Sequence, residues 1–299
     1  MEVIHSLITV SSVRNKAEAP SDGIEEARSS AFGARSLALS LLLGSHPPRL
    51  PVGSLVAAGE LFGVSGGAMR TALSRMSSAG EVSSVEGTYV LSGRLIERQA
   101  RQDVGRRPVD DTWDGRWVTV TPRRSSRPLS DRREMRGHLD GLRLGELRPD
   151  YWLRPANVDL EPILALAQPF DLLVTVGELT VRDLDHLVNE LWSLENLNVR
   201  AAELTGELED LAVRPPVDGR QGRDDGGADN HWLVAAFVVA AEVVRFLTRE
   251  PRLPGELVPS PWTPNRLRAE YDSFERQFQH RLAIFLRRAT SQEDAGIRR

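Results

Sequence analysis

Residues 64–80, Val-Ser-Gly-Gly-Ala-Met-Arg-Thr-Ala-Leu-Ser-Arg-Met-Ser-Ser-Ala-Gly, decide the predicted fold of this 299-residue chain. Ser65 is a favourable N-cap, apolar residues recur at helical spacing from Ala68 to Met76, and Gly80 suits the left-handed conformation that ends a helix. The pattern predicts one amphipathic helix of about four turns. Its other face carries two guanidinium groups and two hydroxyls: Arg70, Thr71, Ser74 and Arg75. Such a face suits a DNA major groove.

Two further helices are predicted before this one. Residues 35–43 are strongly apolar and stop at Gly44 and Pro47-Pro48. Residues 55–62 have helical apolar spacing, and Gly63 turns the chain toward the next helix. Two helices joined by so short a turn have the spacing of a helix-turn-helix.

A small hairpin is predicted after the central helix. Residues 81–84 and 88–91 flank Val85-Glu86-Gly87, which has the composition of a tight turn. Together with the three helices, the hairpin predicts a winged helix-turn-helix over residues 32–106.

The same letters also match a catalytic motif. Residues 63–67, Gly-Val-Ser-Gly-Gly, fit the G-x-S-x-G nucleophile elbow, in which Ser65 would be the nucleophile of a hydrolase. An elbow needs a buried strand before the serine, whereas residues 56–62 have helical periodicity. Residues 63–67 are therefore interpreted as part of the helix-turn-helix and not as a nucleophile elbow. A three-helix core with solvated arginines is the alternative that the residues leave open.

Composition narrows the class of protein. The chain has no cysteine, which excludes disulfides, a thiolate nucleophile and cysteine-ligated zinc. No signal peptide is recognisable at the N-terminus, and the longest apolar run, residues 232–247, contains Glu242 and Arg245, so we expect a buried helix and a cytoplasmic protein. We expect no metal, no cofactor and no membrane partner.

The net charge of −4 is unevenly distributed. Positive charge is in excess over residues 111–154, and negative charge over residues 155–299. DNA binding requires a basic contact surface rather than a basic protein, so an acidic distal half is compatible with it.

The remaining sequence predicts a small α+β segment followed by helices. Residues 117–121 and 170–176 have strand patterns, and residues 132–144 have helical spacing. A long helical pattern over residues 183–211 is followed by a polar, glycine-rich stretch. Trp192, Trp232, Trp262 and Phe246 are candidates for an effector cavity, although core packing is the commoner role of such residues.

Several motifs in collinear order resemble the PaaX family of bacterial transcriptional repressors. They include Ala34-Arg35-Ser36-Leu37, Phe62-Gly63-Val64-Ser65, Met69 to Met76, Trp113 to Trp117, Arg132 to Arg136, Tyr151 to Pro155, Pro251 to Pro254 and Pro261-Trp262. The resemblance covers residues 33–288 and implies a repressor released from its operator by a small effector, of which phenylacetyl-coenzyme A is the type case. One departure is the hairpin, which is shorter than in the family and carries Glu86 where basic residues are usual.

The resemblance also implies a ferredoxin-like, Cas2-like central domain. A Cas2-like nuclease needs an aspartate at the end of its first strand to hold a metal, but this chain has Thr119-Val120-Thr121-Pro122 there. We therefore expect no nuclease and, more generally, no enzyme.

Arginines are densest between residues 123 and 136. The cluster comprises Arg123, Arg124, Arg127, Arg132, Arg133 and Arg136. Guanidinium forks match phosphate oxygens, so a second DNA-phosphate contact or a pocket for the phosphates of an acyl-coenzyme A effector is one interpretation. A solvated surface is the other.

The predicted organisation is α+β and mostly helical. It has a flexible arm (1–31), the winged helix-turn-helix (32–106), a ferredoxin-like domain (111–180) and a helical C-terminal domain (181–299) with a mobile loop at 214–230. The predicted partners are an operator in double-stranded DNA, an acyl-coenzyme A effector and a second copy of the chain, because an inverted repeat is read by two helices about 34 Å apart. The predicted DNA contacts are Arg35, Ser65, Arg70, Thr71, Ser74 and Arg75. A protein-interaction module that has lost DNA binding is the alternative function.

Overall fold

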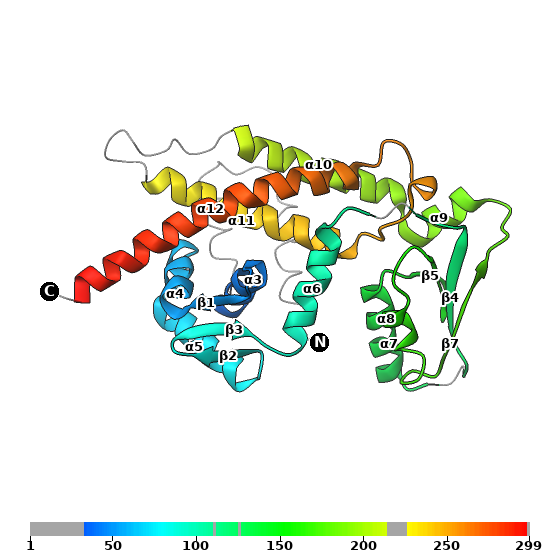
Figure 1. Ribbon diagram of the computed structural model, residues 1–299, viewed down its shortest axis with the longest axis horizontal. Helices are drawn as coiled ribbons and strands as arrows, with labels where there is room; N and C mark the ends of the chain where they lie inside the picture. Colours follow the sequence, from blue (N-terminus) through cyan, green and yellow to red (C-terminus); the bar gives the residue numbers. More distant parts are fainter. Residues whose placement is uncertain (1–32, 110–111, 125–126, 214–225, 298–299) are drawn as a thin grey trace. The chain divides into compact units, whose positions relative to one another are not determined.

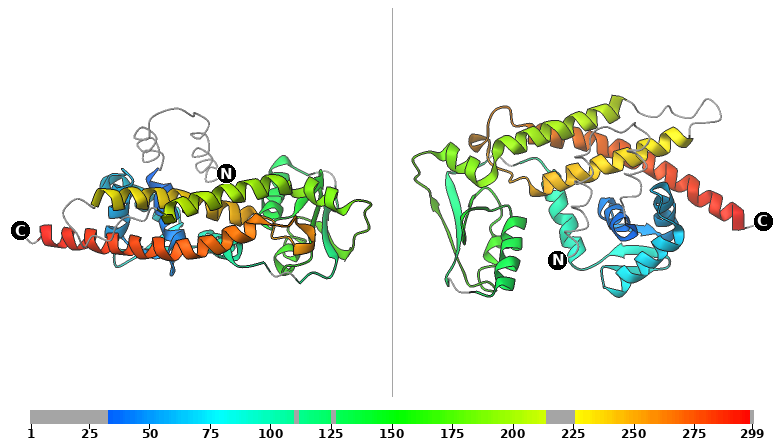
Figure 2. Two further views of the ribbon diagram at one scale, coloured as in Figure 1. Left: turned by 90° about the horizontal axis from the view of Figure 1, so that it is seen from above. Right: turned by 180° about the vertical axis from the view of Figure 1, so that it is seen from behind.

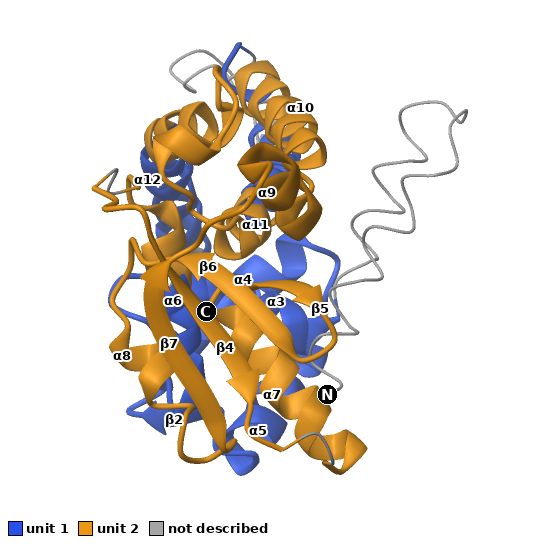
Figure 3. Ribbon diagram, turned by 90° about the vertical axis from the view of Figure 1, so that its right-hand side faces the viewer, with its two compact units in different colours: residues 1–101, 211–241, 274–299 blue, residues 102–210, 242–273 orange. Residues whose placement is uncertain are grey.

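The computed structural model describes residues 33–109, 112–124, 127–213 and 226–297. It is an α+β protein in which helices predominate, with one three-stranded and one four-stranded antiparallel sheet in the described part. The predicted arm at 1–31 lies outside the described residues. The chain divides into two compact units (Figure 3). The first unit comprises the described parts of 1–101, 211–241 and 274–299, and the second those of 102–210 and 242–273.

The first unit begins with three helices and a small sheet (Figure 1). The helices are α3 (Ala34–Gly44), α4 (Val52–Leu61) and α5 (Gly66–Ser78), and the strands are β1 (Arg49–Pro51), β2 (Val82–Val85) and β3 (Thr88–Leu91). The predicted hairpin pairs Ser83 with Val90, and β1 adds to its other side with Leu50 opposite Tyr89. Strand β1 was not predicted, because a strand of three residues that follows Pro48 and ends at Pro51 is too short to show alternation.

A dense apolar core joins the three helices. The largest side chains buried to less than 2% exposure are Leu37, Leu42, Leu55, Phe62, Met69, Leu73, Met76 and Leu91 in this part of the chain. Both α3 and α4 pack against α5. Burying side chains of this size supplies most of the favourable free energy that holds such a small unit together.

A further helix, α6 (Arg94–Arg106), closes the end of α3. Gln99 of α6 is buried, and its Nε2 donates hydrogen bonds to the carbonyls of Leu43 and Ser45, each at 2.9 Å. These bonds satisfy carbonyls that the end of a helix leaves without partners. Helix α6 was not predicted, because its sequence is polar and contains too few apolar residues to show helical spacing.

The first unit is completed by parts of two long helices, α11 (Gly226–Arg249) and α12 (Thr263–Ile297). Phe237 of α11 lies against Phe62, with ring centroids 4.8 Å apart. Trp232 packs on Phe274 and Phe278 of α12. The predicted C-terminal domain is therefore divided between the two units, because these apolar helix faces are buried with α3 and α4 rather than only with each other.

Helix α11 contains a stretch, Asp229–Arg249, that is long and apolar enough to cross a membrane by length and composition, with a mean hydropathy of 1.6. A core helix of a globular protein has the same properties. Seven of its apolar residues are buried: Trp232, Leu233, Ala236, Phe237, Ala240, Val243 and Leu247. The buried face agrees with the core helix predicted for residues 232–247.

The second unit contains the four-stranded sheet. Its elements follow the order β4 (Arg116–Pro122), α7 (Leu129–Gly141), β5 (Gly145–Arg148), β6 (Tyr151–Pro155), α8 (Glu161–Leu164) and β7 (Leu172–Glu178). The strand order is β5-β6-β4-β7, and every neighbouring pair is antiparallel. In β4, which lies between β6 and β7, Val118 is opposite Arg154 on β6 and Val176 on β7.

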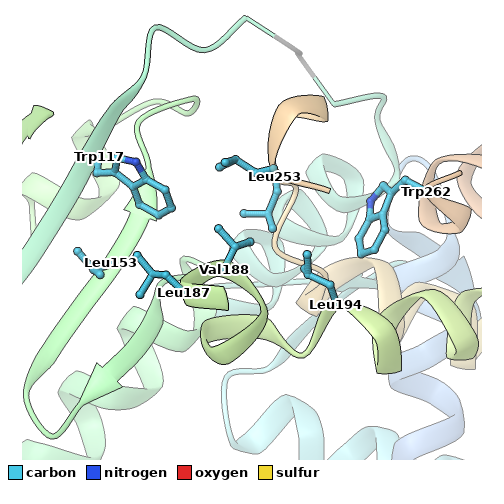
Figure 4. Packing of buried hydrophobic residues seen from close by; sticks show 8 residues of the cluster. Trp117, Leu153, Leu187, Val188, Leu194, Leu253 and Trp262 are labelled. Atoms are coloured by element: carbon cyan, nitrogen blue, oxygen red, sulfur yellow. The ribbon is translucent and has the colours of Figure 1, made fainter. Parts of the chain in front are cut away.

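Each face of this sheet has its own core. On one face Val118, Val120 and Trp152 pack with Met135 and Leu139 of α7. On the other face Trp117 and Leu153 meet a cluster contributed by later segments (Figure 4). Those later residues are Leu187, Val188, Leu194, Leu253, Leu257 and Trp262. Trp262 and the half-buried Trp192 therefore belong to a core.

The long helical pattern over 183–211 is interrupted in the structure. It forms α9 (Leu184–Trp192) and α10 (Leu194–Val213), separated by Ser193 with a φ of 49°. The side chain of Asn189 accepts a hydrogen bond from the backbone N–H of Leu194, which stabilises the break. The helical pattern is confirmed, but the break was not predicted, since apolar spacing continues through it.

The predicted loop at 214–230 lies mostly outside the described residues. Residues 226–230 form the first turn of α11, so the loop prediction is wrong for them. The turn η2 (Gly255–Leu257) lies in the proline-rich segment that leads to α12.

Four arginines of the second unit are gathered around one carboxylate. We call this the buried arginine cluster: Arg143, Arg154, Arg252, Arg268 and Glu250. Glu250 is fully buried and ion-pairs with Arg268, which is 5% exposed. The other guanidinium groups donate to backbone carbonyls, for example Arg154 to Leu142 at 2.6 Å. Burial lowers the pKa of Arg154 to about 9, and neighbouring arginines contribute to this shift. The group still carries its charge at neutral pH.

Candidate nucleic-acid interface

Helix α5 begins and ends as its sequence predicts. The hydroxyl of Ser65 accepts a hydrogen bond from the backbone N–H of Ala68 at 3.3 Å, which confirms the N-cap. Gly80 follows the helix with a φ of 69°, a conformation that glycine adopts without strain. The buried face consists of Met69, Leu73 and Met76. Anchoring one face in this way fixes which side chains point outward.

The opposite face of α5 is exposed. Arg70, Thr71, Ser74 and Arg75 are all exposed side chains, at spacings that place them on one side of the helix. The hydroxyl of Thr71 donates to the carbonyl of Gly67 at 2.9 Å, so its oxygen remains as an acceptor while its proton is held by the helix. The structure therefore brings together the four side chains predicted for the central helix.

Helix α5 lies very close to the helix before it. A β-carbon added at Gly59 of α4 would come within 3.0 Å of the Met69 side chain and 3.2 Å of the Val64 carbonyl oxygen. One added at Gly66 would come within 3.1 Å of a guanidinium nitrogen of Arg70, so this side chain extends back over the start of its own helix. These glycines set the distance between α4, the turn and α5.

Arg35, which the sequence predicts as a phosphate contact, has a partner within the first unit. Its guanidinium forms a two-pronged ion pair with Glu81, with Nε 3.1 Å from Oε2. The side chain of Arg35 is 38% exposed. The pair ties the start of α3 to the residue that precedes β2, and its carboxylate neutralises the charge that a phosphate would need. The guanidinium of Arg35 is therefore held within the protein by Glu81.

The hairpin β2–β3 is exposed at its tip but carries no positive charge. Its turn has φ values of 49° at Glu86 and 75° at Gly87, as a two-residue hairpin turn requires. Val85 is 60% exposed. Residues 82–91 contain no lysine or arginine. The basic residue on this sheet is Arg49 of β1, an exposed side chain that was not selected as a contact because β1 itself was not predicted.

The arginines between residues 123 and 136 do not form one continuous basic surface. Arg124 lies 3.4 Å from the carboxylate of Asp171, and Arg127 donates to the Asp171 carbonyl. On α7, Arg136 pairs with Glu146 at 2.9 Å, and Arg132 lies 3.9 Å from Asp150. Arg123 and Arg133 are exposed. Much of this charge is therefore neutralised locally, as in the solvated interpretation.

The described residues do not form the geometry that a nucleophile elbow or a Cas2-like metal site requires. The helix α4, not a strand, leads to Ser65, so the strained turn of a nucleophile elbow is not formed there. At the end of β4, Pro122 lies opposite Leu172. Among the described residues there is no group of three or more histidine, aspartate or glutamate side chains placed to hold a metal ion.

Comparison with known proteins agrees with this geometry. A family model described as PaaX-like protein matches residues 33–95, which run from the start of α3 to the start of α6. Among solved structures, the uncharacterized protein Rv0674 from Mycobacterium tuberculosis is similar, with 30% sequence identity and a TM-score of 0.61, over 84% of this chain and 98% of that one. No curated protein matches. This chain belongs to the PaaX-like family.

Proposed function

We propose that the protein is a transcriptional regulator that binds double-stranded DNA through α5. The observation that carries the proposal is the exposed face of Arg70, Thr71, Ser74 and Arg75 on a helix whose other face is buried. A rigid helix with guanidinium groups and short hydroxyl side chains fits the width of the major groove and the acceptors of guanine.

In this proposal α3, α4, α5 and the β1-β3-β2 sheet form a winged helix-turn-helix, with α5 as the recognition helix. The second unit would contain a ferredoxin-like domain, a proposal supported by its β-α-β-β-α-β element order and its strand order β5-β6-β4-β7. Two copies would read an inverted repeat with half-sites about one helical turn, or 34 Å, apart. A small effector would release the protein from its operator and so relieve repression.

The wing contributes less than α5 to DNA binding in this proposal. Residues 82–91 lack basic side chains, and Glu86 would lie near phosphates of the same sign. Arg49 of β1 is the basic residue that the sheet offers instead. We therefore expect the affinity to depend mainly on Arg70 and Arg75.

The charge of the surface around α5 favours a second function, a protein-interaction module that keeps the fold without binding DNA. The acidic wing and the Arg35–Glu81 ion pair both remove positive charge from the surface around α5. The two functions differ in a direct test of DNA binding.

The test uses duplexes selected from a random-sequence pool, together with the region upstream of the gene, in mobility-shift titrations. The double variant Arg70→Ala with Arg75→Ala is compared with Arg94→Ala with Arg101→Ala, which removes equal charge from exposed positions of α6. Each base-contacting arginine is worth about 1–3 kcal/mol, so the first variant should lose at least about tenfold in affinity and the second should change little. Sequence-specific binding that survives in the first variant, or no binding by the native protein, would exclude the proposed role of α5.

A further inference from the structure

The buried arginine cluster of the second unit holds more positive charge than its carboxylate balances. Two of its arginines, Arg154 and Arg268, are buried, and the other two, Arg143 and Arg252, are half-buried. Within the cluster, four guanidinium groups against the one carboxylate of Glu250 leave a formal excess of three positive charges. A charge removed from water is stable only where partners offset its lost hydration, so this excess must be compensated at the cluster.

Three helices that end at the cluster provide part of the compensation, because the guanidinium groups donate to carbonyls at the ends of α6, α7 and α11. The acceptors are the carbonyls of Val104, Gly105, Arg107, Pro108, Leu142 and Thr248. Figure 2 shows the teal end of α6 beside the amber end of α11, and a β-carbon added at Gly105 would come within 2.6 Å of the Leu247 carbonyl oxygen. Since a helix C-terminus carries about half a negative charge, three such ends reduce the excess to roughly one to two positive charges.

Arg143 forms a side of the cluster that is open to solvent. Every guanidinium nitrogen of Arg268 donates to a partner within the second unit. In Arg143 only Nε is engaged, with the carbonyl of Thr248 at 3.2 Å. Its two terminal nitrogens have no partner in the part of the chain that the structure describes, and solvent reaches them. Burial and the nearby charge of Arg252 lower the pKa of Arg143 to about 10, so the group is charged at neutral pH.

We propose that the open side of the buried arginine cluster binds an oxyanion of the phosphate class. Parallel N–H groups of a guanidinium match two oxygens of such an anion, and the terminal nitrogens of Arg143 are available for this contact. A divalent anion also matches the excess of roughly one to two charges that the helix ends leave. A chloride ion lacks the pair of oxygens, and a carboxylate has the pair but only half the charge. The site belongs to the second unit and is independent of DNA binding by α5.

The binding test is calorimetry on the full chain at neutral pH, in a chloride buffer of constant ionic strength. The probes are inorganic phosphate, sulfate, acetate and adenosine monophosphate. Phosphate and sulfate should bind, and acetate should bind about tenfold more weakly or less because of its lower charge. Adenosine monophosphate that binds as tightly as phosphate would indicate a phosphate monoester as the ligand, and loss of its binding would indicate the free ion. If neither phosphate nor sulfate binds at millimolar concentrations, the proposal is overturned.

The site is located with a variant of Arg143. Arg143→Gln removes the guanidinium group and its charge, and Arg182→Gln removes an exposed arginine of the same unit as the matched control. The first should weaken phosphate binding by about tenfold or more, because it removes charge-assisted hydrogen bonds, and the second should leave it within about twofold. A folded Arg143→Gln variant that binds phosphate as tightly as the native protein would mark the ion as adventitious and refute the site.

Thermal denaturation separates an anion site from a purely structural role of Arg143. An anion that binds only the folded state raises the melting temperature. Phosphate also stabilises proteins in general, so the measure is the difference between two proteins at the same ionic strength. The rise on replacing chloride with phosphate should be larger in the native protein than in Arg143→Gln. Equal rises in the two proteins would overturn the proposal.

A second variant covers the case in which Arg143→Gln does not fold. Arg143→Lys keeps the positive charge in the cluster but has no planar pair of donors. Its affinity for phosphate should therefore fall by about fivefold or more. An unchanged affinity would show that the guanidinium of Arg143 does not hold the anion and would refute the site.

Discussion

Replacing Glu250 with glutamine should destabilise the second unit strongly, because one buried carboxylate balances two buried arginines, Arg154 and Arg268, and two half-buried ones, Arg143 and Arg252. The change keeps the size of the side chain and leaves an oxygen that can still accept from Arg268. It removes the charge that offsets Arg143, Arg154 and Arg252, each of which has its pKa raised by Glu250 against the effect of burial. The variant therefore isolates the electrostatic contribution of the carboxylate.

The expected loss follows from the surroundings of Glu250. Its Oε1 is buried and accepts no hydrogen bond from any residue in the described part of the chain, so this oxygen acts on the arginines mainly through its charge. Removing one partner of a buried ion pair costs about 3–5 kcal/mol. Because glutamine keeps one hydrogen bond to Arg268, we expect the lower end of that range, a loss of about 3 kcal/mol in the free energy of unfolding.

Urea denaturation followed by tryptophan fluorescence suits this measurement. Five of the six tryptophans lie in the second unit, and only Trp232 lies in the first. Glu256→Gln is the matched control, since Glu256 is an exposed carboxylate in the same unit. It should cost less than about 0.5 kcal/mol. A loss below about 1 kcal/mol in Glu250→Gln would show that the arginines do not depend on this carboxylate.

Two further predictions concern α4 and Arg154. Gly59→Ala should lower the melting temperature relative to Gly67→Ala, because the added carbon meets Met69 and Val64 at Gly59 but nothing within 4 Å at Gly67. Thermal denaturation monitored by circular dichroism measures both melting temperatures. Equal shifts in the two variants would contradict the close approach of α4 to α5. Burial lowers the pKa of Arg154 to about 9 in the folded protein, well below the ordinary value that the group keeps in the unfolded chain. Between the two values the unfolded chain binds more protons, so the contribution of Arg154 to stability rises with pH from about 9 upward. The stability difference between the native protein and Arg154→Met should therefore shift in favour of the native protein from about pH 8 to about pH 10.5, and a constant difference would refute the lowered pKa.

The part of the fold that sequence predicts well is the part in which local signals agree. In α5 the N-cap at Ser65, the apolar spacing and Gly80 all indicate the same helix, and each has its expected role in the structure. The hairpin turn at Glu86 and Gly87 is a similar case, because its two positive φ values suit few residue types. Consistent local preferences make such segments predictable.

The parts that sequence did not predict depend on individual contacts that apolar spacing does not show, most of them between distant residues. Ser193 adopts a left-handed conformation inside a continuous apolar pattern, and the side chain of Asn189, one turn earlier, stabilises the break. Strand β1 exists because β3 offers it an edge, and Gln99 is buried because the end of α3 needs donors. Spacing along one segment contains no information on these partners.

The candidate site shows the same division. Arg70 and Arg75 were selected from periodicity, and the structure leaves them exposed on one face of α5. Arg35 was selected for its place at the start of the first helix and for the family resemblance, but its partner Glu81 lies 46 residues along the chain.

The motifs behind the family resemblance do not all have the same role. Arg154 belongs to one motif and Arg252 to another, nearly one hundred residues later, and both are in the buried arginine cluster of the second unit. Asn157 connects the two segments by donating to the carbonyl of Arg252 at 2.9 Å. The two motifs lie far apart in the sequence but contact each other in the fold. A family resemblance that depends on them therefore indicates a shared fold and not DNA binding. DNA binding must be judged on α5, where removing two exposed arginines should weaken recognition by at least about tenfold without disturbing the cluster.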